Sequence, residues 1–188
     1  LIKIALGHKA ISVGTIGVFD SQGEVYPEFG TTTPSYVDIR KIINKFQNSY
    51  EACFMEVSSH SLVQNRLNEL RLDAGAWTSF SQDHLDYHKD MLSYSFAKKK
   101  FFDDLKKEAI VLINGDDIHS NFMVQNCKSK VYKYSIKTDG DFTLKILENS
   151  VEGILIKIKE SEIYCKIAGT FNGYNILAAY SCSLCLGI

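Results

Sequence analysis

Short apolar runs alternate with segments of helical spacing along the first two thirds of the chain. The runs predict strands at residues 12–19, 52–57, 74–80 and 110–113. The last three contain few charges, which is typical of strands that are buried on both faces. The first is expected to end in a turn at residues 20–23.

The segments between these strands are predicted to be helices. Apolar residues recur at i, i+3, i+4 and i+7 over residues 39–46, which predicts an amphipathic helix with Thr33 as N-cap and Pro34 as its first residue. Further helices are expected after Ser59 and over residues 91–107. Strands that alternate with helices imply right-handed βαβ units, so we predict an α/β fold with a mostly parallel sheet flanked by helices.

After about Val131 the pattern changes to alternation of apolar and polar residues. The alternating segments are residues 142–146, 154–158 and 163–167, with turn-like stretches between them. This alternation predicts a series of antiparallel hairpins, which we interpret as an antiparallel β extension at the edge of the parallel sheet. A closing helix is expected from about Asn172.

Composition limits the class of protein and of partner. The 188 residues suit one domain, or one with a small subdomain, and 45% of them are hydrophobic, enough for a core. The formal net charge of -1 gives no reason to expect nucleic acid or an anionic membrane as a partner. The 5 cysteines, irregular in spacing, favour a reducing compartment over a disulfide framework. The CxxC pair of Cys182 and Cys185 is interpreted as two apolar helix residues.

The N-terminal segment is apolar but is interrupted by Lys3, His8 and Lys9. It has neither the flanks of a signal peptide nor the run of about twenty apolar residues that spans a membrane. It also begins without Met and in the middle of a pattern. We therefore expect the chain to come from a longer, cytoplasmic protein.

Polar residues gather where three of the predicted strands end. The clusters are EVSSH at residues 56–60, SFSQDHLDYH at 79–88 and NGDD at 114–117. Ligands of open α/β sheets bind at the carboxyl ends of the strands, so the clusters are expected to converge on one crevice. Glu56 is accordingly a candidate metal ligand or general base, and an exposed strand-end carboxylate is the alternative. The Ser-His pair near it has no GxSxG elbow and no clear third partner, which argues against a hydrolase triad.

The second cluster is crowded with acids and histidines. His84 and His88 have the i, i+4 spacing of a zinc site, but Leu85 stands where the HExxH motif requires Glu. A hard cation such as Mg²⁺, bound together with phosphates, suits Asp83 and Asp86 better, and a solvated acidic loop is the alternative. The lysines at 98–100 are most simply a solvated helix face, and spacing singles out none of them.

Several motifs, in one consistent order, resemble the Mur ligases. They are EVSSHSLVQNR at residues 56–66, SQDHLDYHKDM at 81–91 with FAKKKFF at 96–102, and GTFNGYN at 169–175. The resemblance covers essentially the whole chain, and the first motif is most similar to the member that adds the third residue of the cell-wall peptide. It implies that residues 1–188 form a Rossmann-like, P-loop-type central domain that binds ATP, with a UDP-binding N-terminal and an amino-acid-binding C-terminal domain outside the chain.

The resemblance also implies that one part of the ATP site is missing. The family's GTNGKTT phosphate loop belongs just before Leu1 and does not occur in residues 1–188. Such a loop cradles phosphates with its backbone N–H groups and a Lys. We therefore expect this fragment alone to be inactive.

The family's functional residues carry over by position. Those matched to contacts of the UDP-muramoyl substrate are Thr32, Thr33, Ser58, Gln64 and Arg66. Those matched to ligands of a catalytic Mg²⁺ are Glu56, His84 and Lys98. Lys98 corresponds to the family's carbamylated lysine, in which a CO₂-derived carbamate turns a cationic amine into an anionic acceptor. Those matched to the ATP site are Asn114, Asp117, Asn172 and Asn175.

The implied reaction is ATP-dependent amide-bond formation in peptidoglycan synthesis. The D-glutamyl carboxylate of UDP-N-acetylmuramoyl-L-alanyl-D-glutamate attacks the γ-phosphate of ATP, and the amine of an amino acid then displaces phosphate from the acyl phosphate. The amino acid, meso-diaminopimelate or L-lysine, stays open at this point. The alternatives are another Mur or folylpolyglutamate-type ligase and a non-catalytic relative that binds a nucleotide or a UDP-sugar.

Overall fold

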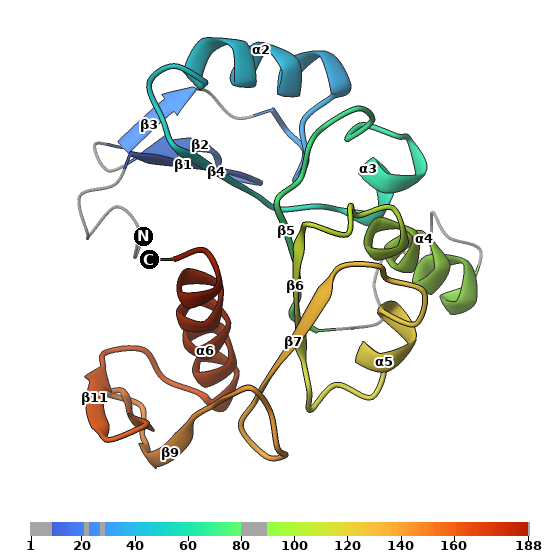
Figure 1. The fold of residues 1–188 in the computed structure, drawn as a ribbon. Coiled ribbons are helices and arrows are strands. Elements are labelled where there is room, and N and C mark those ends of the chain that lie inside the picture. The colour runs from blue at the N-terminus through green and yellow to red at the C-terminus, as the bar shows by residue number, and fades with distance from the viewer. Residues whose placement is uncertain (1–8, 21–22, 27–28, 80–89, 188) are drawn as a thin grey trace. The chain divides into compact units, whose positions relative to one another are not determined.

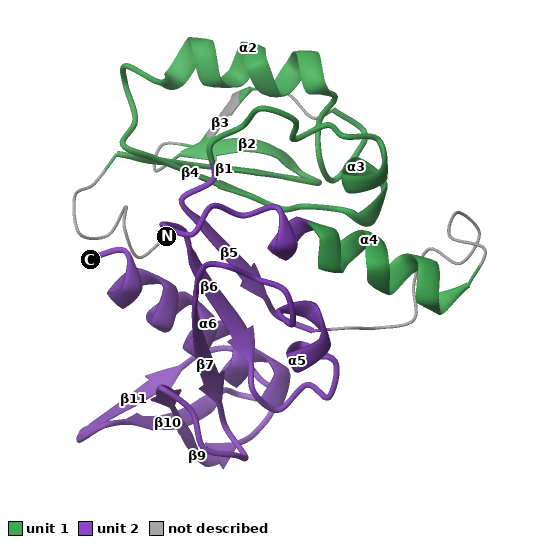
Figure 2. Ribbon diagram, turned by 45° about the vertical axis from the view of Figure 1, so that its right-hand side comes forward, with its two compact units in different colours: residues 1–71, 84–100 green, residues 72–83, 101–188 purple. Residues whose placement is uncertain are grey.

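The computed structural model describes residues 9–20, 23–26, 29–79 and 90–187. The chain divides into two compact units, Leu1–Arg71 with His84–Lys100 and Leu72–Asp83 with Phe101–Ile188 (Figure 2). The first unit contains one β-sheet and the second contains two, and each unit has its own buried hydrophobic residues.

A four-stranded sheet forms the first unit, in the order β3-β2-β1-β4 (Figure 1). Its strands are β1 (Ala10–Gly14), β2 (Gly17–Asp20), β3 (Gly23–Tyr26) and β4 (Ala52–Met55). Strand β1 runs antiparallel to β2 and parallel to β4. The single strand predicted over residues 12–19 is therefore wrong. Gly14 and Gly17 flank a two-residue turn, and Gly17 has a φ of 115°, which a glycine adopts without a steric penalty.

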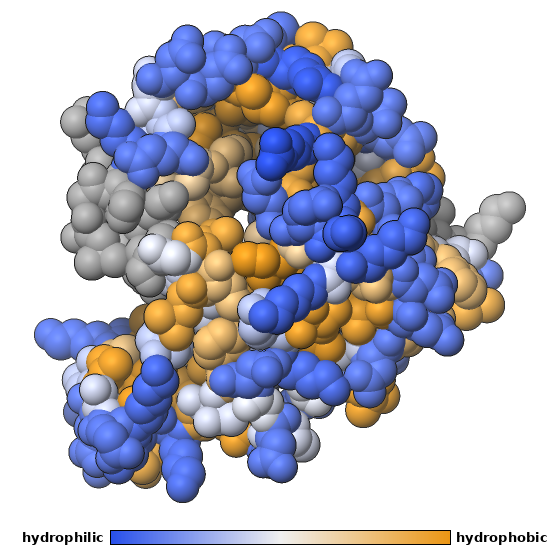
Figure 3. All heavy atoms as spheres, viewed as in Figure 1, coloured by the Kyte–Doolittle hydropathy of each residue, from blue (hydrophilic) through white to orange (hydrophobic). Residues whose placement is uncertain are grey.

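Helix α2 (Tyr36–Phe46) supplies the core of this unit. Ile39, Ile42 and Phe46 are buried on one side of the helix, which confirms the amphipathic helix predicted from the spacing. Ile42 and Phe46 pack in one cluster with Val13 and its neighbours in the sheet. The outward side of α2 is mostly hydrophilic (Figure 3).

Two local predictions for this unit are wrong. The N-cap of α2 is Ser35, whose hydroxyl accepts a hydrogen bond from Asp38 N at 3.2 Å, and not Thr33. The Thr33 hydroxyl is instead engaged with the end of β4. Strand β4 is less buried than its apolar run predicts, with Phe54 37% exposed, because β4 is an edge strand of this unit's sheet.

Two further helices confirm the predictions of a helix after Ser59 and of a helix within residues 91–107. Helix α3 (Ser59–Val63) begins after its N-cap Ser58, whose hydroxyl accepts a hydrogen bond from Ser61 N at 3.2 Å. Helix α4 (Met91–Asp103) is shorter than the predicted segment 91–107.

The second unit contains an all-parallel sheet in the order β5-β6-β7-β8. Its strands are β5 (Ala74–Trp77), β6 (Ile110–Asn114), β7 (Lys130–Ser135) and β8 (Phe142–Thr143). The parallel sheet flanked by helices confirms the predicted fold class. The sequence did not predict β7, and it assigned β8 to an antiparallel hairpin.

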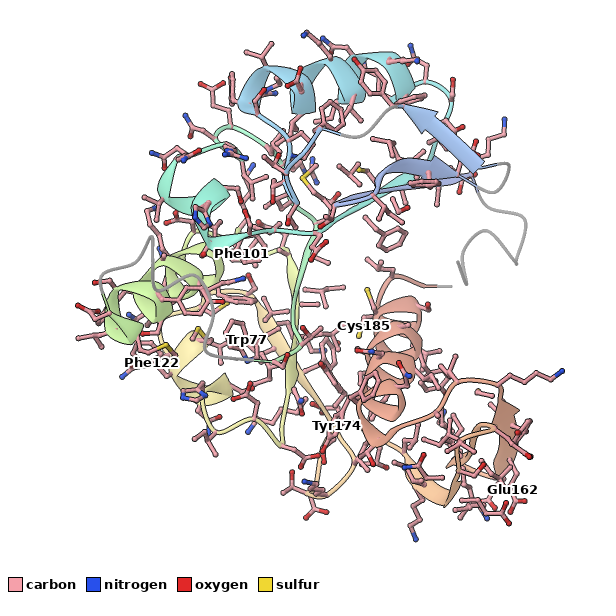
Figure 4. All side chains as sticks on the ribbon, turned by 180° about the vertical axis from the view of Figure 1, so that it is seen from behind. Trp77, Phe101, Phe122, Glu162, Tyr174 and Cys185 are labelled. Carbon is pink, nitrogen blue, oxygen red and sulfur yellow. The ribbon has the colours of Figure 1, made fainter. Side chains whose placement is uncertain are left out.

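Helices cover both faces of this parallel sheet. Val111 and Ile113 of β6 pack with α5 (Ser120–Met123) and the end of α4, whereas Leu112 packs with α6 (Thr170–Cys185). Three aromatic side chains lie on the face away from α6 (Figure 4): Trp77, Phe101 and Phe122. The alternation of side chains along one strand thus gives the second unit two hydrophobic layers.

The predicted antiparallel extension is confirmed, as a separate sheet of the second unit. Its strands are β9 (Lys145–Asn149), β10 (Ile154–Ile158) and β11 (Ser161–Cys165), in the order β11-β10-β9. It is therefore not an edge of the parallel sheet. Ile154 and Ile156 are fully buried and pack in the cluster that includes α6, whereas Ile163 on β11 is 44% exposed.

All five cysteines are free, and Cys182 and Cys185 lie in α6 as predicted. Among the helices that the structure describes, none combines the length and the apolar character needed to cross a membrane.

A carboxylate ties the end of β6 to two other elements of the second unit. Asp116 accepts hydrogen bonds from the backbone N–H groups of Ile136, Lys137 and Thr138 at 2.7, 2.9 and 2.9 Å, and from the Thr138 hydroxyl at 2.7 Å. Tyr174, which projects from α6 (Figure 4), donates to it at 2.8 Å. The loop after β6 is therefore fastened to the turn after β7 and to α6.

These contacts determine the protonation of both partners. Burial alone would raise the pKa of the Asp116 carboxyl, but the hydrogen bonds from Thr138, Lys137, Ile136 and Tyr174 outweigh it and hold this pKa well below its usual range. Burial and the hydrogen bond to Asp116 raise the pKa of Tyr174 to about 12. The pair is therefore a carboxylate and a neutral phenol at neutral pH.

We predict that Asp116→Asn destabilises the protein more at pH 7 than at pH 3. A carboxyl with a depressed folded-state pKa stabilises the fold above its unfolded pKa of roughly 3.9 and loses this effect as the pH falls toward the folded value. Urea unfolding at the two pH values measures the difference. Asp139→Asn removes an exposed carboxylate near the same turn and should change the unfolding free energy little. Equal destabilisation by Asp116→Asn at both pH values would contradict the role of the charge.

Candidate functional site

The candidate site of the first unit is built on the parallel pair β1 and β4. The register pairs Val13 with Met55, and Glu56 N donates to Val13 O at 2.9 Å, so the pairing continues one residue beyond β4. The side chain of Glu56 consequently lies against the turn that follows β1. Its Oε2 is 3.4 Å from Thr15 Oγ1 and 3.3 Å from the position that a Cβ on Gly14 would take.

Thr33 fixes the backbone of this strand end. Its hydroxyl donates to Glu56 O at 2.9 Å and accepts from Ser58 N at 2.9 Å. Arg66 Nη1 in turn donates to Thr33 O at 2.5 Å. Because the Thr33 side chain is fully buried, its hydroxyl faces the strand end and not solvent. The structure thus brings together four of the sequence-predicted site residues from three separate segments.

A pocket lies beside this strand end. Arg66 Nε donates to Gln64 Oε1 at 2.9 Å, and both side chains line a pocket of about 390 Å³. The other lining residues, from the loop before α2 and from its first turn, are Phe29, Thr31, Ser35, Tyr36 and Asp38. Thr32 does not line the pocket, and its Oγ1 lies 3.1 Å from Thr15 Oγ1. A guanidinium at a pocket suits an anionic carboxylate or phosphate, which it can bind through two parallel hydrogen bonds.

Lys98 reaches the same strand end from α4. Its Nζ donates to Val57 O at 3.3 Å and lies 5.9 Å from the centre of the Tyr94 ring. The expectation that residues 98–100 form a solvated face is wrong in part, because Lys99 is only 4% exposed. Lys98 is half-buried and Lys100 is exposed, so adjacent lysines of one helix have three different environments.

The oxygen donors around Glu56 fit a hard cation only in part. The Glu56 carboxylate and the Thr15 hydroxyl are oxygen donors of the kind that Mg²⁺ prefers. A protonated Lys98 amine would repel a cation, so Lys98 fits a metal site only as a carbamate. His84 lies outside the described residues. Within the described part of the chain, no group of three or more His, Cys, Asp or Glu side chains could hold a metal ion.

In the second unit, the residues matched to the ATP site hold strand ends together. Asn114 Nδ2 donates to Thr78 O at 3.0 Å, and Asn114 Oδ1 accepts from Asp116 N at 3.0 Å. Asp117 Oδ2 accepts from Trp77 Nε1 at 3.2 Å, and its Oδ1 accepts from His119 N at 2.8 Å. Both side chains thus connect the end of β6 to the end of β5 or to the following turn.

Asn172 and Asn175 lie in the first turns of α6. Asn172 Nδ2 donates to Ala168 O at 2.8 Å, and its amide oxygen accepts from Asn175 Nδ2 at 3.2 Å. The hydrogen bond between Tyr174 and Asp116 joins this end of α6 to the NGDD loop. Sequence reasoning had singled out the NGDD motif but had given Asp116 and Tyr174 no role.

Sequence reasoning also missed Thr15. The available signal was the GTIG segment at residues 14–17, which forms the turn between β1 and β2. The EVSSH and NGDD clusters lie in different units, and residues 80–89 lie outside the described part of the chain. The convergence of the three clusters on one crevice therefore stays a prediction.

Comparison with known proteins identifies the family. Residues 1–183 match the model of the Mur ligase middle domain. A UDP-N-acetylmuramoyl-L-alanyl-D-glutamate–2,6-diaminopimelate ligase from Bacteroides fragilis is 42% identical over 159 residues, which are 83% of this chain and 32% of the relative. The ligase of the same name from Parabacteroides distasonis is 40% identical over 183 residues, or 97% of this chain and 37% of the relative. The chain therefore spans about a third of the length of these relatives.

Solved structures share the fold. A structure of a ligase of the same name aligns with a TM-score of 0.81 at 23% identity, covering 98% of this chain and 39% of that chain. MurF ligase from Thermotoga maritima, solved in complex with ADP, aligns with a TM-score of 0.62 at 13% identity, covering 98% of this chain and 40% of that one. By its match over nearly its whole length, the chain belongs to the Mur ligase family and corresponds to the middle domain.

Proposed function

We propose that the chain is the ATP-handling central domain of a ligase that adds an amino acid to UDP-N-acetylmuramoyl-L-alanyl-D-glutamate in peptidoglycan synthesis. The observation that carries the proposal is the identity of 40–42% to two ligases with this dipeptide in their names. Both relatives are named for 2,6-diaminopimelate, which favours this amino acid over lysine. In this proposal the UDP-binding and amino-acid-binding domains lie outside residues 1–188.

The muramoyl substrate would bind beside the end of β4. Thr32, Ser58, Gln64 and Arg66 are the proposed contacts. The pocket that Gln64 and Arg66 line supports the assignment of these two residues. Arg66 would pair with an anionic group of the peptide or phosphate. Thr33 is the remaining proposed residue. Because Thr33 is buried, an indirect role in substrate binding is favoured, in which it holds the backbone at Glu56 and Ser58 in position.

A Mg²⁺ ion would be held by Glu56, His84 and carbamylated Lys98. The contact of Lys98 Nζ with Val57 O supports this assignment, because it holds the amine against the residue that follows Glu56. When bound, the ion would supply the positive charge that lets an anionic carboxylate approach an anionic phosphate. Glu56 and the carbamate would hold this ion in position, and Arg66 would hold the substrate for in-line transfer of the phosphoryl group.

ATP would contact Asn114, Asp117, Asn172 and Asn175. The hydrogen bond between Asp116 and Tyr174 supports their common assignment, because it connects the two segments that carry them. The ADP bound to the Thermotoga maritima relative is consistent with a nucleotide site in this fold. The chain's 188 residues contain no GxxxxGK[ST] phosphate loop, so the fragment alone is expected to neither hydrolyse ATP nor ligate.

We predict that the full-length protein releases phosphate only when ATP, Mg²⁺, the UDP-dipeptide and one amino acid are all present. A coupled phosphate assay with diaminopimelate and L-lysine tested separately measures the requirement. Release with diaminopimelate supports the proposal, and release with lysine alone would correct the choice of amino acid. Tight binding of the UDP-dipeptide without release with either amino acid would favour a non-catalytic binding protein.

We predict that Lys98→Ala in the full-length protein lowers kcat by about a hundredfold or more, which is the usual cost of losing an electrostatic stabiliser of the transition state. Affinity for the UDP-dipeptide should change little, as isothermal titration measures. Lys100→Ala, at an exposed position two residues further along α4, is the matched control and should retain activity. Equal losses of kcat in both variants would argue against a catalytic role specific to Lys98.

A further inference from the structure

The turn between β1 and β2 points a hydroxyl at the proposed metal ligand. Gly14 pairs with Gly17, so Thr15 and Ile16 form the whole turn. Both residues are exposed, Ile16 to 74%, but the Thr15 hydroxyl lies within hydrogen-bonding distance of two side chains of the site. It is 3.1 Å from Thr32 Oγ1 and 3.4 Å from Glu56 Oε2.

The chemistry of a hydroxyl limits what Thr15 can do at one time. A threonine hydroxyl has a single proton to donate and lone pairs with which it can accept. It can therefore donate to Thr32 or to Glu56, but not to both. When Thr32 donates its own proton to Thr15, the Thr15 proton is directed at the Glu56 carboxylate. The hydrogen bond to the carboxylate thus depends on the orientation of the Thr32 hydroxyl.

The turn also limits the movement of the Glu56 side chain. A Cβ at position 14 would lie 3.3 Å from Glu56 Oε2, so the carboxylate packs directly on the glycine backbone. Thr33 fixes the backbone carbonyl of the same residue. Thr15 is then the side chain in this turn that can orient the carboxylate.

We propose that Thr15 is a positioning residue, which orients the Glu56 carboxylate for its cation and links that carboxylate to the substrate contact Thr32. This inference rests on the proposed function of Glu56 as a metal ligand. A muramoyl substrate that accepts or donates a hydrogen bond at Thr32 would change the orientation of the Thr15 hydroxyl. Binding of the substrate and binding of the cation would be coupled in this way.

The test uses the full-length protein and Mn²⁺ as a spectroscopic probe, with free Mn²⁺ measured by electron paramagnetic resonance. Thr15→Val keeps the shape of the side chain but removes its hydroxyl, and Thr15→Ser retains the hydroxyl. We expect Thr15→Val to weaken Mn²⁺ binding about three- to tenfold, the scale of one ordinary hydrogen bond, because the Thr15 hydroxyl is exposed to water. Thr15→Ser should bind Mn²⁺ as the unmodified protein does. The melting temperatures should remain close to one another.

Two further variants distinguish a failure of the Thr15 role from a failure of the Glu56 metal role. Ser12→Ala removes an exposed hydroxyl from the neighbouring strand β1, one that donates to Phe19 O, and should leave Mn²⁺ binding unchanged. Glu56→Gln removes the proposed ligand itself. If Glu56→Gln weakens Mn²⁺ binding and Thr15→Val does not, the positioning role is overturned while the proposed function stands. If Glu56→Gln has no effect, the metal role of Glu56 fails, and the inference fails with it.

Discussion

The parallel pairing of β1 with β4 is the constraint on which the candidate site of the first unit depends. Parallel strands bring their carboxyl ends to the same edge of a sheet. The hydrogen bond from Glu56 N to Val13 O extends this pairing to the residue that carries the carboxylate. A shift of one residue in the register would turn Glu56 to the opposite face and away from Thr15. The register therefore determines which side chains can meet there.

Polar side chains maintain this arrangement through contacts between distant segments. Thr33 connects the loop before α2 to the end of β4, and Arg66 connects the segment after α3 to Thr33. In the second unit Asp116 has the same structural role, because it connects the end of β6 to the turn after β7 and to α6. Across the described residues, no buried side-chain nitrogen or oxygen lacks a hydrogen-bond partner. Such satisfied networks avoid the cost of unpaired buried polar groups and fix a loop in one conformation.

The sequence predicted those features that depend on local periodicity. The α2 helix follows from the spacing of its apolar residues, and the parallel strands β5 and β6 follow from short apolar runs. Contacts between residues far apart in the sequence could not be predicted from local periodicity. Thr33 has the residue type of an N-cap, but its hydroxyl bonds a strand end more than twenty residues away, and Ser35 caps the helix. Strand β7 (KVYKYS) was not recognised, because its lysines interrupt the apolar run expected of a parallel strand.

The candidate site, like the fold, was predicted from the sequence only in part. Motif resemblance selected Thr33, Ser58, Gln64 and Arg66, and the structure places all four in one hydrogen-bonded cluster. Thr15 and Asp116 were missed, because their importance comes from tertiary neighbours and not from any spacing along the chain. The burial of Lys99 was missed for the same reason, since three successive lysines read as a solvated face.

The central claim is that the full-length protein activates a substrate carboxylate by phosphorylating it. The most direct measurement follows oxygen from that carboxylate. UDP-N-acetylmuramoyl-L-alanyl-D-glutamate labelled with ¹⁸O in its D-glutamyl carboxylate is turned over with ATP and diaminopimelate, and the released phosphate is analysed by mass spectrometry. An acyl phosphate keeps a carboxylate oxygen bound to phosphorus when the amine displaces it, so the account predicts ¹⁸O in the phosphate. Amide formation with unlabelled phosphate would contradict it.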